Sequence, residues 1–338
     1  MANIFILGCG FGSGLAALWA KAGHNVTAYS NNAEEIAILS REREHKKLLP
    51  GVVLPKSIRF TNDISNAKSA EIIVFAVPSK FIGQAAKTVA PRVSKNAVVI
   101  SVSKGFSELK CDCDSGVVCR MSEVIGDAIS DKPIVVLTGP CHAEEVGNSH
   151  PTAVVAACEN QDLSEYTQTT LQTKTFRIYV NRDVIGCELG GALKNPIALC
   201  CGIAHGMGLK DNASAALMTR GLAEIKRLGT AYGAECQTFS GLAGVGDLIV
   251  TCTSEHSRNN RAGRLIGQGV SAEEAIQKVG TVEGYECVEV ALKLAREKNV
   301  YMPIFEQLYK ICYENLSPQK ALENLMSLPQ GHEQICFW

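Results

Sequence analysis

The segment Gly8-Cys9-Gly10-Phe11-Gly12-Ser13-Gly14 follows directly on the apolar run 3–7 and leads into a helical pattern at 15–21. A strand, a glycine-rich turn and a helix in this order are typical of loops that bring backbone N–H groups against a pyrophosphate at a helix N-terminus. The next apolar run, 26–29, completes a strand–helix–strand unit, which makes the glycine pattern far more specific than it is alone. We therefore predict a dinucleotide-binding domain whose coenzyme contacts include Gly8, Gly10, Phe11, Gly12 and Ser13.

The spacing of these glycines is irregular. Counted from Gly8, the third position of the usual pattern is occupied by Ser13; aligned on Gly12, the loop is one residue short. The pattern thus leaves open which glycine packs closely against its neighbours. A purely structural glycine turn is the alternative interpretation.

Short apolar runs alternate with helical patterns through the first half of the chain. Several are nearly all apolar, as parallel strands buried on both faces must be. The expected strands are 3–7, 26–29, 72–77, 98–102, 134–138 and 153–157. From about residue 183 the pattern is helical, with helix starts at Ser271 and at Ser317-Pro318. These patterns predict an α/β domain with a Rossmann-type doubly wound parallel sheet, residues 1–182, followed by an all-helical domain, residues 183–338.

Composition limits the kind of partner. A formal net charge of -1 argues against broad nucleic-acid binding and favours a small-molecule ligand. We expect no stable membrane insertion and a cytoplasmic protein, because no apolar run reaches about 18 residues and no charged leader precedes the first strand. The fourteen cysteines lie mostly in apolar runs and are expected to be reduced thiols. The cluster Cys111, Cys113 and Cys119 lacks zinc-site spacing, so no metal is expected there.

The end of the second expected strand bears on the choice of coenzyme. The sequence Ser30-Asn31-Asn32 contains neither the acid that binds the ribose 2′-hydroxyl of NAD nor an arginine for the 2′-phosphate of NADP. Asn31 is a candidate coenzyme contact. The pattern allows both NADH and NADPH and slightly favours NADPH.

Polar residues gather in four further segments. The pair Lys194-Asn195 lies among small apolar residues, where burial would lower the pKa of the lysine and suit it to proton transfer; a lysine reaching the solvent from a helix edge is the alternative. Ser103-Lys104-Gly105 and 138–143 each follow an expected strand, at the sheet edge where ligands bind. The segment 241–261 combines Asp247 with hydroxyls, asparagines and arginines, a composition that suits a phosphate.

The segments 188–195, 206–220 and 240–259 closely resemble signatures of NAD(P)-dependent glycerol-3-phosphate dehydrogenases, and the similarity covers nearly the whole chain. The resemblance implies reversible hydride transfer between NAD(P)H and dihydroxyacetone phosphate, giving sn-glycerol 3-phosphate for glycerophospholipid synthesis, in a homodimer. It further implies that Lys194 is the general acid/base and that Lys104 contacts both substrate and coenzyme. The remaining substrate-site positions implied are Gly139, Cys141, Asn195, Asp247, Thr251, Ser257, Arg258 and Asn259. Arg258, Ala143 and Glu283 are implied to contact the coenzyme.

The chemistry agrees with these roles, because hydride addition to a ketone leaves an alkoxide that needs a proton donor. We expect Lys104 to lower the pKa of Lys194 by like-charge repulsion and Asp247 to orient it. Cys141-His142 and Pro196 depart from the family pattern, and 108–119 resembles an insertion. A proline within a helix favours a kink, which we expect to help aim Lys194. His205 is expected to be a helix residue rather than the proton donor.

Two other functions compete with this one. A ketopantoate or 3-hydroxyacid reductase would also join a dinucleotide domain to helices and use a lysine–asparagine pair, but a carboxylate substrate would not require the hydroxyl and amide donors of 257–259. The irregular loop and many thiols suggest instead a catalytically silent NAD(P)-binding protein. The presence of Lys194 and Asp247 argues against that alternative.

Overall fold

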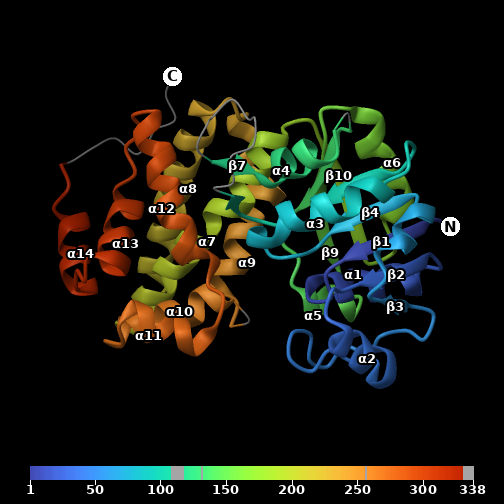
Figure 1. Ribbon diagram of the computed structural model, residues 1–338. Helices are drawn as coiled ribbons and strands as arrows, with labels where there is room; N and C mark the ends of the chain where they lie inside the picture. Colours follow the sequence, from blue (N-terminus) through green and yellow to red (C-terminus); the bar gives the residue numbers. More distant parts are fainter. Residues whose placement is uncertain (108–117, 131, 256, 330–338) are drawn as a thin grey trace. The chain divides into compact units, whose positions relative to one another are not determined.

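The computed structural model describes residues 1–107, 118–130, 132–255 and 257–329 (Figure 1). The chain divides into two compact units, Met1–Val184 and Ile185–Trp338. The first unit contains the sheet and the second is built from helices, in agreement with the expected order of an α/β part and a helical part.

The described part of the first unit forms an eight-stranded sheet with the order β10-β9-β8-β5-β4-β1-β2-β3 (Figure 1). The strands are β1 Asn3–Leu7, β2 Asn25–Tyr29, β3 Arg59–Thr61, β4 Ile72–Phe75, β5 Val98–Ser101, β8 Ile134–Thr138, β9 Thr152–Ala157 and β10 Phe176–Asn181. The helices are α1 Phe11–Lys21, α2 Ala33–Glu42, α3 Ile82–Val89, α4 Met121–Ala128, α5 Ala143–Gly147 and α6 Gln161–Leu171. In a separate small sheet, β6 Phe106–Ser107 pairs antiparallel with β7 Cys119–Arg120.

All six expected strands are present, but β3 and β10 of this sheet and the two-residue strands β6 and β7 were missed, and one direction was wrong. β3 and β10 are short or alternately exposed, so they lack the continuous apolar run of a buried strand. β9 pairs antiparallel with β8, through Leu137 and Ala156 among others, so the sheet is mixed rather than wholly parallel. An apolar run reads the same in both directions, and the sequence pattern therefore could not show this reversal.

The sheet is covered by apolar side chains on both faces. Ile4 and Ile6 of β1 belong to one buried cluster, whereas Phe5 and Leu7 belong to another. Trp19 of α1 is fully buried, and its indole N–H donates to the Leu171 carbonyl at 3.0 Å. This alternation along β1 is that of a strand between two helical layers, as a doubly wound sheet requires.

The structure answers which glycine packs closely in the loop after β1. Gly8 has φ +105°, and a Cβ there would lie 2.6 Å from the Ala76 carbonyl oxygen. A Cβ at Gly12 would meet the Ile6 side chain at 2.9 Å, and one at Gly14 would meet the Ala143 carbonyl oxygen at 2.7 Å. Close packing is therefore divided between Gly12 and Gly14. Ser13 fits at the third position because its hydroxyl donates to the Cys9 carbonyl at 2.6 Å.

Every regular element of the second unit's described residues is helical. The helices are α7 Val184–Gly206, which begins at the end of the first unit, α8 Asp211–Ala231, α9 Asp247–Thr253, α10 Arg258–Gly267, α11 Ala272–Val279, α12 Glu283–Glu297, α13 Pro303–Tyr313 and α14 Pro318–Met326. The expected helix starts are confirmed, since the Ser271 and Ser317 hydroxyls accept backbone N–H bonds at 3.3 Å and 3.2 Å.

Helix α7 is long and apolar enough to cross a membrane, yet 89% of its most apolar window is buried inside the protein. It is therefore a core helix. The helix continues through Pro196, which cannot donate a bond to the Ala192 carbonyl. The Cys287 thiol of α12 donates to that carbonyl instead, at 3.5 Å.

Most of the described cysteines are reduced, as expected, but one forms a disulfide. Ten of the described cysteines are free thiols, most of them buried, but Cys119 is disulfide-bonded. Cys119 lies in β7, at the end of the cysteine-rich segment, and is buried in the apolar core. Cys111 and Cys113 lie outside the described residues.

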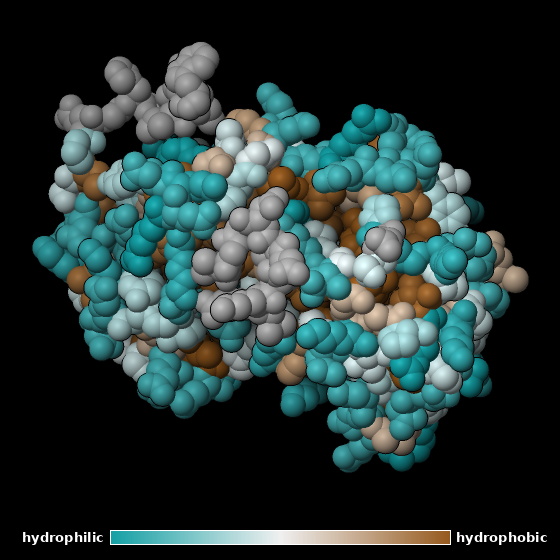
Figure 2. All heavy atoms as spheres, turned by 45° about the horizontal axis from the view of Figure 1, so that its top comes forward, coloured by the Kyte–Doolittle hydropathy of each residue, from teal (hydrophilic) through white to brown (hydrophobic). Residues whose placement is uncertain are grey.

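The face drawn in Figure 2 is mostly hydrophilic, with apolar residues in smaller patches.

Candidate active site

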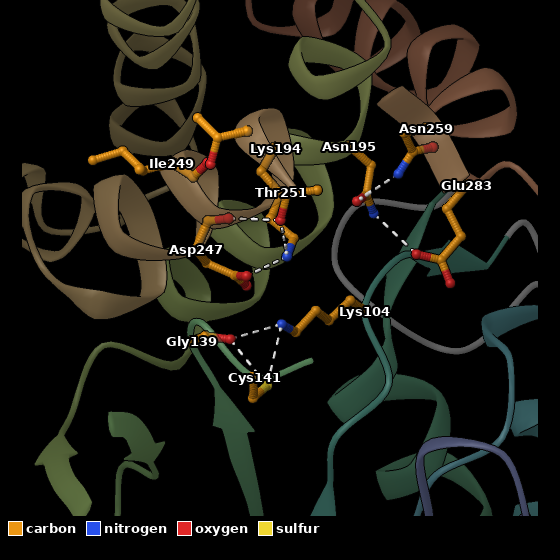
Figure 3. Close-up of polar contacts among 11 residues, drawn as sticks. Lys104, Gly139, Cys141, Lys194, Asn195, Asp247, Ile249, Thr251, Asn259 and Glu283 are labelled. Carbon is orange, nitrogen blue, oxygen red and sulfur yellow. Dashed lines mark hydrogen bonds and ion pairs between the residues drawn. The ribbon is translucent and has the colours of Figure 1, made fainter. Parts of the chain in front are cut away.

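Lys194 of α7 is the centre of a buried polar cluster in the second unit (Figure 3). Its ammonium group forms an ion pair with Asp247 and donates to the Thr251 hydroxyl at 2.8 Å. The Thr251 hydroxyl in turn donates to the Asp247 backbone carbonyl at 2.6 Å. Lys194 is 6% exposed and Asp247 1% exposed, so Lys194 does not extend into the solvent from a helix edge.

Glycines allow α9 to begin close to α7. The π-helical turn Leu242–Gly246 precedes Asp247. A Cβ at Gly190 would lie 2.4 Å from the Ala243 carbonyl oxygen, and one at Gly244 would lie 2.1 Å from the Phe239 carbonyl oxygen. Since no side chain fits at Gly190, the backbone of α7 approaches the π-helical turn closely, one helical turn before Lys194. This packing places Asp247 and Thr251 beside the ammonium group.

Two opposing effects act on the charge of Lys194. Burial disfavours the ammonium form, whereas a carboxylate in contact with it favours that form. Asp247 therefore does more than orient the side chain, as the sequence had suggested, because it also stabilises the protonated lysine. An ammonium group that is charged but shielded from solvent is suited to deliver a proton to a bound ligand.

Asn195 lies in a second chain of hydrogen bonds (Figure 3). Its amide nitrogen donates to Glu283 at 3.0 Å, and its amide oxygen accepts from the Asn259 side chain at 3.0 Å. The Asn259 oxygen accepts from the Gly284 backbone N–H at 2.8 Å. These contacts join α7, α10 and α12 and fix the orientation of both amides.

The N-terminus of α10 carries the residues predicted to hold a phosphate. Ser257 is its N-cap and accepts from the Asn260 backbone N–H at 3.3 Å. Arg258 is the first residue of the helix and is exposed, whereas Asn259 is buried. A guanidinium group and the N–H groups of a helix start are both suited to bind an anion.

In the first unit, residues that follow β5 and β8 come together as expected (Figure 3). The Lys104 ammonium donates to the Gly139 carbonyl at 3.0 Å and lies 3.7 Å from the Cys141 sulfur. The Cys141 thiol donates to the same carbonyl at 3.0 Å. Gly139 has φ +130°, and a Cβ there would meet Val154 at 3.1 Å, so this turn requires glycine.

The predicted coenzyme contacts of this unit lie around the start of α1 and the end of β2. Gly10 is the N-cap of α1 and has no side chain to occupy the first N–H groups, so Phe11, Gly12 and Ser13 present a helix start suited to a pyrophosphate. Asn31 is exposed after β2, while the Asn32 side chain caps α2. Ala143 begins α5 and packs on Gly14 through its carbonyl.

One contact in the charged run 41–47 has no sign in the sequence. His45 of this run pairs with Glu35 of α2 at 3.0 Å. No local pattern could have shown this, because charge runs are usually solvated. His205 is near the end of α7 as expected and contacts the Ser214 hydroxyl at 2.9 Å; burial lowers its pKa. His142 is the N-cap residue of α5.

Comparison with known proteins identifies the family. Residues 3–164 match the N-terminus of NAD-dependent glycerol-3-phosphate dehydrogenase, and residues 183–323 match its C-terminus. Glycerol-3-phosphate dehydrogenase (NAD(P)+) of Desulfitobacterium hafniense strain Y51 is 45% identical over 335 residues, which is 98% of this chain and 93% of the relative. That of Lysinibacillus sphaericus strain C3-41 is 44% identical over 332 residues, 96% of each chain.

Solved structures agree with the sequence matches. The crystal structure of glycerol-3-phosphate dehydrogenase from Coxiella burnetii has a TM-score of 0.90 and 33% identity, and covers 97% of this chain and 99% of its own. A ketopantoate reductase from Ralstonia eutropha JMP134 has a TM-score of 0.58 at 13% identity, over 95% of this chain and 99% of its own, which shows a similar fold only. Because both halves match over nearly their full length, the chain belongs to the family of NAD(P)-dependent glycerol-3-phosphate dehydrogenases and is an oxidoreductase.

Proposed function

We propose that this enzyme reduces dihydroxyacetone phosphate reversibly to sn-glycerol 3-phosphate, with the coenzyme on residues 1–182 and most substrate contacts on residues 183–338. The observation that carries the proposal is the buried cluster of Lys194, Asp247 and Thr251. A reductase of a ketone needs a proton donor with a defined position, and this cluster supplies one inside a helical core.

Lys194 is the proposed general acid. Its ammonium donates to Asp247 and to Thr251, and one of its protons is the one proposed to pass to the substrate oxygen. As negative charge develops on the C2 oxygen, Lys194 gives up this proton, and in the reverse direction it takes the proton back. The Asp247 carboxylate and the Thr251 hydroxyl hold Nζ in place in both states. The nicotinamide coenzyme, when bound, supplies or accepts the hydride.

The other predicted substrate residues have complementary tasks in this proposal. Asn195 is oriented by Glu283 and Asn259 and donates to the substrate from its amide. Ser257, Arg258 and Asn259 at the start of α10 bind the phosphate, as Arg and helix N–H groups commonly do. In the first unit, Lys104 with Gly139 and Cys141 contacts substrate, and Lys104 also contacts the coenzyme.

The geometry of the loop after β1 supports binding of the coenzyme to the first unit. The N–H groups at the start of α1 are suited to the pyrophosphate, and side chains at Gly8 or Gly12 would clash with the protein itself. Ala143, Arg258 and Glu283 complete the proposed coenzyme contacts. Both NADH and NADPH are proposed to serve, with NADPH slightly favoured, because no acid follows β2 within Ser30-Asn31-Asn32.

The family resemblance also supports a physiological setting. We propose that the enzyme supplies sn-glycerol 3-phosphate for glycerophospholipid synthesis and works as a homodimer in the cytoplasm. Sedimentation of the purified enzyme at several concentrations tests the dimer.

The decisive experiment measures oxidation of NADPH and of NADH with dihydroxyacetone phosphate and with ketopantoate. Lys194→Ala is expected to lose about 10²- to 10⁴-fold in kcat, the usual contribution of a positioned acid. Lys278→Ala, which removes an exposed lysine of the same unit, should keep wild-type rates. Turnover of ketopantoate alone would replace the proposed substrate, and coenzyme binding without any turnover would indicate the silent binder.

A further inference from the structure

Glu35 and His45 form a partly buried pair beside the coenzyme loop. The Glu35 carboxylate lies 3.0 Å from His45 Nε2, and the two side chains are only 24% and 12% exposed. The Leu48 backbone N–H donates to His45 Nδ1 at 3.3 Å. Because Nδ1 accepts, a neutral imidazole carries its proton on Nε2 and donates it to Glu35. His45 therefore fixes the position of the carboxylate.

The carboxylate of Glu35 faces the end of β2. The Ser30 hydroxyl accepts from the Asn32 backbone N–H at 3.2 Å and hydrogen-bonds to Glu35. The bond from His45 is the main reason that the pKa of Glu35 lies below its usual value, so Glu35 is ionised at neutral pH. Burial first, and then the charge of Glu35, raise the pKa of the Cys9 thiol in the glycine loop.

A negative charge is thus present where the sequence shows no acid. The end of the second strand is where sheets of this type hold the adenosine ribose, and an acid there accepts a bond from the 2′-hydroxyl. A 2′-phosphate at the same place would be repelled. Glu35 reaches this place from the first turn of α2, five residues after Ser30, and for that reason the strand-end pattern alone misses it.

We propose that Glu35, positioned by His45, is a specificity-determining residue that limits the use of NADPH relative to NADH. This inference rests on the proposed function and explains why a preference for NADPH would be only slight. Removal of the Glu35 charge then favours NADPH selectively. The ribose of NADH loses one acceptor, whereas the phosphate of NADPH loses a repulsive neighbour.

The side chains around Glu35 and His45 are either uncharged or bonded to other partners. From the glycine loop the Cys9 thiol faces Glu35, and from β2 the Ser30 hydroxyl does so; both are uncharged. The charged side chains of the run after α2 are directed to other partners: Arg43 to the Ile58 carbonyl, Glu44 to the Gly51 N–H, and Lys46 to Glu42. The Glu35 carboxylate therefore keeps its negative charge beside the end of β2.

The test compares the ratio of kcat/KM for NADPH to that for NADH, with dihydroxyacetone phosphate, and the Kd of each coenzyme from its fluorescence. Glu35→Gln should raise the ratio about fivefold, the upper range for one partly exposed charge pair. Glu34→Gln, which removes an exposed carboxylate from the same helical turn, is the matched control and should leave the ratio unchanged.

A second variant, His45→Gln, keeps a donor to Glu35 and should therefore keep the wild-type ratio. An unchanged ratio in Glu35→Gln, with both coenzymes still bound, would overturn this inference and leave the proposed function intact. Absence of coenzyme binding to the wild-type enzyme would instead refute the proposed function itself.

Discussion

Helices α7 and α10 cross at four glycines, and the substitution Gly263→Ala tests how far the active site depends on this crossing. Gly202 and Gly206 of α7 face Gly263 and Gly267 of α10. A Cβ added at any of the four would lie only 2.1 to 2.3 Å from a carbonyl oxygen of the opposite helix. At Gly263 the nearest atoms would be the Leu199 oxygen at 2.3 Å and the Ile203 nitrogen at 2.7 Å.

The size of the effect follows from these distances. Ordinary C···O contacts are about 3.3 Å, so the new methyl group would push the two backbones apart by about 1 Å. Overpacking of this kind costs about 1 to 3 kcal/mol, and the better helix propensity of alanine returns up to about 1 kcal/mol of that. With the full return from helix propensity, we therefore expect Gly263→Ala to lower the free energy of unfolding by up to about 2 kcal/mol.

The same displacement should reach the substrate site, because α10 carries Asn259 one turn before Gly263. The 3.0 Å bond from Asn259 to Asn195 would lengthen, and the proposed phosphate contacts of Arg258 would move with it. We expect KM for dihydroxyacetone phosphate to rise severalfold and the Kd of NADH to change less, since Arg258 is the one proposed coenzyme contact that α10 carries.

Urea unfolding and initial-rate kinetics measure both effects. Gly126→Ala in α4 is the matched control, because a Cβ there meets no atom within 4 Å. It should raise stability by up to about 1 kcal/mol and leave the kinetics unchanged. If Gly263→Ala were as stable as Gly126→Ala and kept the wild-type KM, the close crossing would not position α10 and the reasoning would be wrong.

Three further predictions concern single side chains. Glu224 is 2% exposed and accepts the N–H groups of Ile304 and Phe305, and burial raises its pKa to about 7. The folded state therefore holds this proton more tightly than the unfolded state, and stability should fall by up to about 3 kcal/mol as the pH rises from about 4.5 to 7. Glu224→Gln should remove that part of the decline in urea unfolding measured across this range; an equally steep decline would exclude Glu224 as its source. Cys141→Ser, which places a better hydrogen-bond partner beside Lys104, should lower KM for dihydroxyacetone phosphate about threefold, and a higher KM would show that the thiol is preferred. Pro196→Val should lower kcat if the proline helps to aim Lys194, and unchanged kinetics would end that hypothesis.

The sheet was largely predictable because its central strands obey a simple physical rule. β1, β4, β5 and β8 are buried on both faces and must be apolar throughout, so their sequence alone marks them. β3 and β10 escape the rule, since they lie at the two edges of the sheet and keep polar or exposed side chains. The direction of β9 depends on the path that the chain takes after β8. This path does not change the hydrophobic pattern of β9, so the sequence could not show that β9 runs antiparallel to β8.

The candidate site was predictable only as a set of segments. Lys194 was marked by its apolar surroundings, and 257–259 by its donors, but neither pattern shows which side chains meet. The contact of Asn195 with Glu283 spans 88 residues, and that of Lys194 with Thr251 spans 57. Such pairings result from helix packing, which is set here by glycines whose missing side chains carry no positive signal in the sequence.

Pro196 shows how tertiary structure can remove the cost of a local irregularity. A proline inside a helix leaves the carbonyl four residues earlier without its usual donor, and a buried carbonyl without a partner is costly. In this protein that carbonyl belongs to Ala192, and the buried Cys287 thiol donates to it from α12. Gly284 follows Glu283 on the same helix and packs closely against α7. A Cβ added at Gly284 would lie only 2.5 Å from the Asn195 carbonyl oxygen. Helix α12 thus supports the irregular turn of α7 on both sides of Lys194-Asn195, so the tolerance for Pro196 and the position of the proposed acid depend on the same contact between helices.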